Sequence, residues 1–200
     1  MSIDKIFYIN LDKRTDRREQ IEEELRKYGL EGERYAAIHT PEAGIVGCGY
    51  SHLNVLKLAR ERGYKNVLIL EDDFEFVVSQ EEVENSFRQF FDASIPYDVL
   101  MISYIIQKSA DVPEYPFLRK IIDGQTASGY LVNQHYYDVL IQLYEWAIPL
   151  LESTGSHWLY ANDLVWKRFQ PEGQWFYFTN RLGKQRLSYS DNKLCMVEHE

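Results

Sequence analysis

The sequence contains few cysteines and no long apolar segment. Cys48 and Cys195 are the two cysteines among 200 residues, and their separation matches no metal-ligand spacing, which fits a reduced compartment without structural disulfides. No apolar run approaches the roughly 18 to 20 residues of a membrane span, and residues 1–5 lack the apolar core of a signal peptide. We therefore expect a soluble, cytoplasmic protein without a transmembrane segment, although a domain of a larger secretory-pathway protein would have the same features.

Basic residues are also scarce relative to acidic ones. The chain has 22 lysines and arginines against 31 acids, and its formal net charge of -9 argues against a general nucleic-acid-binding role. Hydrophobic residues make up 45% of the chain and charged residues 26%, which is the composition of a folded protein rather than a disordered one. At this length we expect one compact domain covering residues 1–200.

Strand-like and helix-like patterns alternate along the chain. Short runs rich in β-branched and aromatic residues predict buried strands at 3–11, 34–38, 65–70, 97–104, 128–133 and 174–179. Helical spacing predicts helices at 15–28, 51–62, 83–91, 136–151 and 161–170, the second of them after a glycine-containing loop and the fourth disturbed by its proline at 149. The alternation favours the α/β class, with one mixed, mostly parallel central sheet flanked by helices.

The acidic triplet Glu71-Asp72-Asp73 directly follows the aliphatic run at 67–70. Ligands of open α/β sheets bind where the strands end, and adjacent carboxylates need a cation to offset their repulsion. Mn²⁺ or Mg²⁺ would suit such a site, because these ions are commonly held by one or two carboxylates together with substrate phosphates. The alternative is a solvated turn or a helix cap, the usual fate of short acidic runs.

Several sequence blocks together resemble glycosyltransferase family 25, which includes lipooligosaccharide galactosyltransferases and collagen hydroxylysine galactosyltransferases. The blocks are 7–12, 14–18, 47–52, 70–73 and 185–191, so the resemblance runs from about residue 5 to residue 192. It implies a single GT-A type domain that uses a UDP-sugar donor and a metal-binding acidic motif. The implied reaction is inverting transfer of a hexose, galactose or glucose, to a hydroxyl of a glycan or of a hydroxylysine-type protein acceptor.

The resemblance also implies roles for individual residues. Asp73 and Glu71 would bind the metal, and Asp163 would be the general base that deprotonates the acceptor, with a helix N-cap as its alternative role. Contacts to the donor are implied for Asn10, Leu11, Arg14, Arg17, Ser51, His52 and Asp72. We expect Tyr130, Trp158 and Asp191 to contribute to the acceptor or sugar pocket.

Ser51 and His52 are expected to begin a helix, where free backbone N–H groups would hold an anion or a sugar hydroxyl. A buried structural histidine is the alternative for His52. Cys48 is expected only to pack against its neighbours.

Two other functional classes remain open from the sequence. Acids at strand ends also hold Mg²⁺ in nucleotide and phosphoester hydrolases, and the same fold could serve as a sugar-nucleotide-binding module without turnover. If the acceptor is lipid-linked, the protein would associate with a membrane through it.

Overall fold

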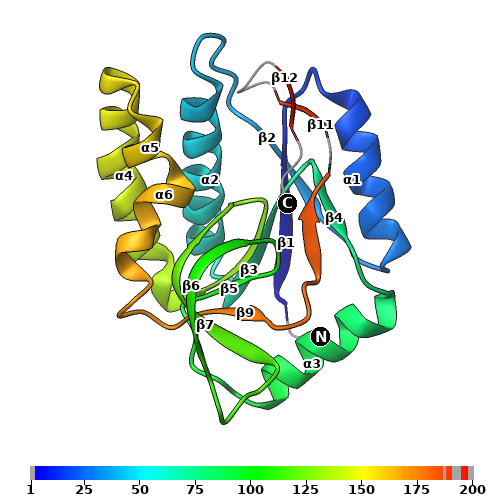
Figure 1. The fold of residues 1–200 in the computed structure, drawn as a ribbon. Helices are drawn as coiled ribbons and strands as arrows, with labels where there is room; N and C mark the ends of the chain where they lie inside the picture. Colours follow the sequence, from blue (N-terminus) through cyan, green and yellow to red (C-terminus); the bar gives the residue numbers. More distant parts are fainter. Residues whose placement is uncertain (1–2, 187, 191–194, 198–200) are drawn as a thin grey trace.

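The computed structural model describes residues 3–186, 188–190 and 195–197, and its centre is an eight-stranded sheet (Figure 1). The strand order is β2-β1-β3-β8-β5-β9-β7-β6. The strands are β1 (Lys5–Asn10), β2 (Glu33–Ala36), β3 (Asn66–Glu71), β5 (Val99–Met101), β6 (Ile105–Asp111), β7 (Leu118–Gln125), β8 (Gly129–Asn133) and β9 (Trp175–Phe178).

The sheet is mixed, with most strands running in one direction. Strand β1 is parallel to β2 and β3, β8 is antiparallel to both β3 and β5, and β5 is parallel to β9. Strand β7 is antiparallel to β9 and to β6. Six strands (β1, β2, β3, β5, β6 and β9) therefore point one way and two (β7 and β8) the other. The predicted α/β class with a mixed, mostly parallel sheet is confirmed.

Helices cover both faces of the sheet, and each face has its own apolar core. They are α1 (Thr15–Lys27), α2 (Gly44–Glu61), α3 (Gln80–Asp92), α4 (Tyr137–Thr154), α5 (His157–Tyr160) and α6 (Asn162–Val165). In β3, Val67 and Ile69 belong to the core that includes residues of α2 and α4, whereas Leu68 and Leu70 belong to the core that includes residues of α1 and α3. This two-sided burial explains why β3 is a continuous apolar run rather than an alternating one.

Helix α2 begins at Gly44, seven residues before the predicted start at residue 51. Its glycines lie at close contacts: a Cβ on Gly47 would come within 2.2 Å of the Ile38 carbonyl oxygen, and one on Gly49 within 3.2 Å of Ile148 Cγ1. The glycines therefore allow the helix to pack against its neighbours and do not form a loop. The predicted loop over this segment is wrong.

Three further differences concern the second half of the chain. Helix α4 continues through Pro149 to Thr154, because Pro149 is exposed and water can bond the carbonyl that loses its partner. The segment 161–170 divides into α6 and a 3₁₀ turn, Trp166–Phe169. The β6–β7 hairpin was not predicted, since its strands are mostly half-exposed and polar.

Among the described residues, no helix combines the length and apolar character needed to cross a membrane.

Two short strand pairs lie outside the main sheet. Strand β4 (Phe74–Phe76) pairs with β10 (Gly183–Gln185) in antiparallel register, which places Gln185 opposite Phe74. Strand β11 (Ser188–Ser190) pairs with β12 (Cys195–Val197). The β4–β10 pair matters most for the site, because it brings the late part of the chain beside the acidic triplet.

Candidate active site at the carboxyl end of strand β3

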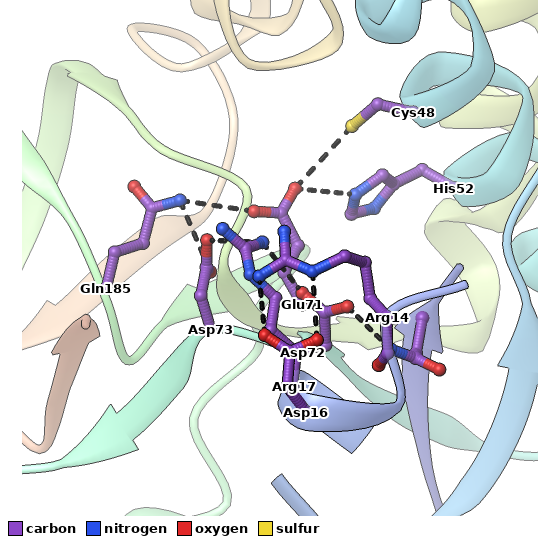
Figure 2. A network of polar contacts seen from close by, with 10 residues as sticks. Arg14, Asp16, Arg17, Cys48, His52, Glu71, Asp72, Asp73 and Gln185 are labelled. Atoms are coloured by element: carbon purple, nitrogen blue, oxygen red, sulfur yellow. Dashed lines mark hydrogen bonds and ion pairs between the residues drawn. The ribbon is translucent and has the colours of Figure 1, made fainter. Parts of the chain in front are cut away.

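The acidic triplet occupies the end of β3 and the turn into β4. Glu71 is the last residue of β3, and Asp72 and Asp73 form the turn. Figure 2 shows the three carboxylates in different surroundings: Glu71 lies toward α2, Asp72 toward α1 and Asp73 toward β10. Other side chains of the protein therefore hold the three acids, which do not form one solvated turn.

Asp72 is held by the ends of β1 and α1. Asn10 Nδ2 donates to Asp72 Oδ2 at 2.7 Å, and Arg17 Nη1 donates to Asp72 Oδ1 at 3.0 Å. Arg17 Nη1 also lies 3.3 Å from Asp73 Oδ2, and Asn10 Oδ1 accepts from Arg34 Nε at 3.0 Å. Burial raises the pKa of Asp72, and the charge of Arg17 opposes that shift. Asp72 thus links the end of β1 to the start of α1 through its contacts with Asn10 and Arg17.

Glu71 uses its two oxygens in two directions (Figure 2). Oε1 lies 3.1 Å from His52 Nε2 and 3.6 Å from Cys48 Sγ, while Oε2 accepts from Gln185 Nε2 at 3.2 Å. Burial disfavours the charged form of this carboxylate, but the His52 ring and the Cys48 thiol outweigh that effect and the pKa lies below its ordinary value. Glu71 is therefore an ionised group in a largely enclosed place.

Asp73 shares the amide of Gln185 with Glu71. Gln185 Nε2 lies 3.5 Å from Asp73 Oδ1, and the pairing of β10 with β4 places it there. Burial, and next the nearby charge of Glu71, raise the pKa of Asp73 to about 7. Carboxylate oxygens are the ligands that a hard divalent cation prefers, and a cation between these two acids would offset the repulsion that helps to raise the pKa of Asp73. The pair Glu71 and Asp73 consequently fits Mn²⁺ or Mg²⁺.

Ser51 and His52 lie in the middle of α2, so the prediction that they begin a helix with free N–H groups is wrong. Both side chains are fully buried. Ser51 Oγ donates to the Gly47 carbonyl at 2.6 Å and accepts from the Ile38 N–H at 2.9 Å, which ties α2 to the segment after β2. His52 contacts Glu71 through Nε2 and the Tyr130 hydroxyl through Nδ1, the latter at 2.8 Å.

Tyr130 has no exposed surface, which does not agree with a side chain that lines a sugar pocket. Its ring packs edge to face against Trp166 at a centroid distance of 5.3 Å, and its hydroxyl contacts His52. Tyr130 therefore positions His52. The neighbouring Gly129 accommodates the ring of Phe74, since a Cβ there would lie 2.8 Å from that ring.

Asp163 is half-buried in the first turn of α6, whose N-cap is Ala161, so the alternative role of Asp163 as the cap does not hold. Its Oδ2 accepts from the backbone N–H of Thr126 at 3.1 Å. Burial raises the pKa of Asp163, and the charge of Glu71 adds to the shift. A carboxylate with a raised pKa is a better proton acceptor than an exposed one.

The other predicted residues have different placements. Arg14 pairs with Asp16, with Nη2 and Oδ2 2.8 Å apart, and lies in the same network as Arg17 (Figure 2). Leu11 is half-buried in the loop after β1 and accepts the Arg14 N–H through its carbonyl at 2.9 Å. Trp158 on α5 is 63% exposed. Asp191 lies outside the described residues.

Sequence reasoning did not assign a function to Gln185, although the late block 185–191 marked its position. A small pocket adjoins this residue; its walls are Ser103, Tyr104, Ile105, Thr126, Arg181, Lys184 and Gln185. These walls include the partner of Asp163 and the amide between Glu71 and Asp73. Contacts with Gln185 and Thr126 therefore connect the acidic pair and Asp163 to one small pocket.

Comparison with known proteins supports the family resemblance. No family model matches the chain. A curated Drosophila melanogaster protein described as "Glycosyltransferase 25 family member" is 31% identical over a 103-residue alignment that covers 38% of this chain and 17% of that protein. The match confirms the resemblance predicted from the sequence blocks, and it spans less than a fifth of the relative's length.

Solved structures share the fold at low sequence identity. A glycosyltransferase involved in the glycosylation of the major capsid of PBCV-1 matches with a TM-score of 0.57 and 13% identity, over 95% of this chain and 95% of that chain. The protein A197 from STIV matches with a TM-score of 0.50 and 11% identity, over 99% of this chain and 95% of that chain. At these identities the likeness concerns the fold, which is of the GT-A type.

Proposed function

We propose that this chain is an inverting glycosyltransferase that moves a hexose, galactose or glucose, from a UDP-sugar to a hydroxyl of a glycan or hydroxylysine-type acceptor. The observation that carries the proposal is the acidic pair Glu71 and Asp73 at the end of β3. Both acids contact Gln185, which lines the same small pocket as Thr126, the partner of Asp163. Open α/β sheets bind their ligands at such strand ends. The Drosophila relative and the PBCV-1 structure, both named as glycosyltransferases, support this reaction class.

The donor end of the site comprises the acidic pair and the adjacent arginines. Glu71 and Asp73 would hold Mn²⁺ or Mg²⁺ together with the diphosphate, and the cation would offset charge on the departing UDP. Arg17 already contacts Asp72 and Asp73, and Arg14 lies beside it, so two guanidinium groups border the place where the diphosphate would bind.

The loop after β1 would complete the nucleotide contacts. Asn10 and Leu11 lie where β1 ends, next to β3 in the sheet, and Asn10 already holds Asp72 in place. In this scheme Ser51, His52 and Asp72 act by positioning the site, because protein groups contact each of their side chains.

Asp163 would be the general base. The acceptor oxygen forms a bond to the anomeric carbon while the bond between that carbon and the UDP oxygen breaks, and the hydroxyl proton moves to the Asp163 carboxylate. The N–H of Thr126 holds Oδ2 of Asp163 in a fixed orientation. Exposed Trp158, on the helix before α6, would stack on a sugar ring of the acceptor.

A donor panel with matched variants tests the proposal. The assay compares wild-type protein with Asp163→Asn, Asp73→Asn and the control Asp138→Asn. Asp138 is an exposed acid on α4 that pairs with Arg60 near the end of α2. Each protein is incubated with UDP-galactose or UDP-glucose and an acceptor, in the presence of either Mn²⁺ or EDTA. We expect acceptor-dependent UDP release from wild type and the control, and little from the other two variants. Sugar release at an equal rate without acceptor would indicate a hydrolase. A sugar-nucleotide-binding module without turnover would be indicated if the protein binds the donor equally well with and without Mn²⁺ and in both site variants.

A further inference from the structure

Cys48, His52 and Glu71 form a second group of potential metal ligands. Cys48 and His52 are four residues apart and lie on one face of α2, and Glu71 faces them from the end of β3 (Figure 2). One ligand atom from each of the three lies within 4.8 Å of the other two. The donor atoms are a sulfur, an imidazole nitrogen and a carboxylate oxygen, which differ in chemistry from the oxygen pair of Glu71 and Asp73.

The distances between the ligand atoms resemble the edges of a tetrahedral zinc site. With Zn–S of about 2.3 Å and Zn–N and Zn–O of about 2.0 Å, tetrahedral angles place sulfur and oxygen about 3.5 Å apart and nitrogen and oxygen about 3.3 Å apart. The corresponding distances here are 3.6 Å between Cys48 Sγ and Glu71 Oε1, and 3.1 Å between His52 Nε2 and the same oxygen. Two of the three edges therefore match a tetrahedral site, and the third, between the sulfur and the ring nitrogen, is at most 4.8 Å.

His52 is already oriented as a metal ligand would be. Its Nδ1 contacts the Tyr130 hydroxyl at 2.8 Å, and Tyr130 is packed against Trp166. Metal-binding histidines almost always use the second ring nitrogen in such a hydrogen bond, which fixes the ring and its tautomer. In the metal-free protein the Nε2–H faces the ionised Glu71 carboxylate, and metal binding would move the ring proton to Nδ1 and free the Nε2 lone pair for the cation.

From these contacts we propose that Cys48, His52 and Glu71 form a site for a thiophilic divalent cation such as Zn²⁺. A set of sulfur, nitrogen and oxygen ligands selects Zn²⁺ over Mn²⁺ or Mg²⁺, which prefer oxygen alone. Binding would release the Cys48 thiol proton to solvent. Glu71 would belong to both metal sites, with Oε1 in this one and Oε2 facing Gln185 and Asp73.

Cobalt titration tests the site without donor, acceptor or turnover, so its result is independent of the proposed transferase activity. Co²⁺ bound to a thiolate gives a near-ultraviolet charge-transfer band, and Zn²⁺ displaces it. We expect a band that saturates at one Co²⁺ per chain in metal-free wild-type protein, is lost in Cys48→Ser and persists in Cys195→Ser. His52→Asn and Glu71→Gln should weaken Zn²⁺ binding, and Tyr130→Phe should weaken it by about 10- to 100-fold, as measured by competition with a chelator.

Two results would overturn the site. If the three side chains only satisfy one another by hydrogen bonds, the wild-type protein gives no thiolate band. If the band is lost in Cys195→Ser, the ligand is the other cysteine. Should Cys48→Ser fail to fold by circular dichroism, the band in Cys195→Ser still decides the matter, because Cys48 is then the remaining cysteine.

Discussion

The backbone N–H of Thr126 donates to Asp163 Oδ2 at 3.1 Å, and Thr126 has a φ of 92°, in the left-handed region that a threonine rarely adopts. The strained residue lies between β7 and β8, and Asp163 lies on α6, so the contact joins two distant parts of the chain. Strain of this kind persists where the surrounding structure fixes it, and it is frequent at functional sites.

Replacing Asp163 by asparagine should strongly reduce turnover and spare the fold. The amide oxygen of the new side chain can still accept the Thr126 N–H, but the amide cannot accept a proton from the acceptor. We expect kcat to fall by about 10²- to 10⁴-fold with a nearly unchanged melting temperature. Initial rates of UDP release and thermal unfolding measure both, and activity near wild type would exclude Asp163 as the base.

Thr126→Gly should remove strain and keep the hydrogen bond to Asp163. The strain of about 1 to 3 kcal/mol is relieved, against a chain-entropy cost of about 0.5 to 1 kcal/mol for glycine, so the free energy of unfolding should stay equal or rise. Urea unfolding measures it. A clear loss of stability would show that the threonine side chain contributes more than its backbone strain costs.

Arg17→Met should destabilise the protein strongly. The side chains of Arg17 and Asp72 are about one-tenth exposed. Removing the guanidinium leaves the buried carboxylates of Asp72 and Asp73 without their ion-pair partner. Loss of one partner of a buried pair costs about 3 to 5 kcal/mol. Arg18→Met is the matched control: Arg18 is exposed and pairs with Glu22, so its removal should change the urea midpoint little. Equal effects of the two changes would contradict the proposed role of Arg17.

Glu33 should make stability depend on pH in the acid range. A hydrogen bond from Lys5, opposed by partial burial and assisted by Arg62, lowers its pKa below the ordinary 4.5. The stabilisation is therefore present above the unfolded-state pKa and is lost as the pH falls through the lowered folded-state value. Urea unfolding from pH 7 to pH 3 should show a shallower decline for Glu33→Gln than for wild type. The exposed neighbour Glu31, changed to Gln, serves as the control.

Gly47→Ala and Gly49→Ala should differ although both place alanine in the same helix. At Gly47 the new Cβ meets the Ile38 carbonyl oxygen at 2.2 Å, and backbone must move. At Gly49 it meets the Ile148 side chain at 3.2 Å, which can adjust. We expect Gly47→Ala to cost about 1 to 3 kcal/mol and Gly49→Ala to be neutral or to gain up to about 1 kcal/mol from helix propensity. Equal unfolding free energies would refute the close packing of α2.

Much of the donor end of the site was visible in the sequence. The aliphatic run 67–70 predicted a strand buried on both faces, and the acids after it lie at the carboxyl end of β3 as expected. The roles assigned to Asp73, Glu71 and Asp163 stay predictions. The predicted start of α2 is wrong because glycine by itself indicates a helix break, whereas the close contacts of Gly47 and Gly49 with residues outside the helix favour glycine at both positions.

Local patterns alone determined the class of fold and the strand that carries the acidic triplet, because burial and periodicity are properties of short segments. Tertiary structure decided which side chains surround that triplet. Gln185 reaches Asp73 through the β4–β10 pair, Cys48 and His52 reach Glu71 through the packing of α2, and Thr126 meets Asp163 across two elements. Each contact joins residues far apart in the chain, and no local propensity specifies such a pairing.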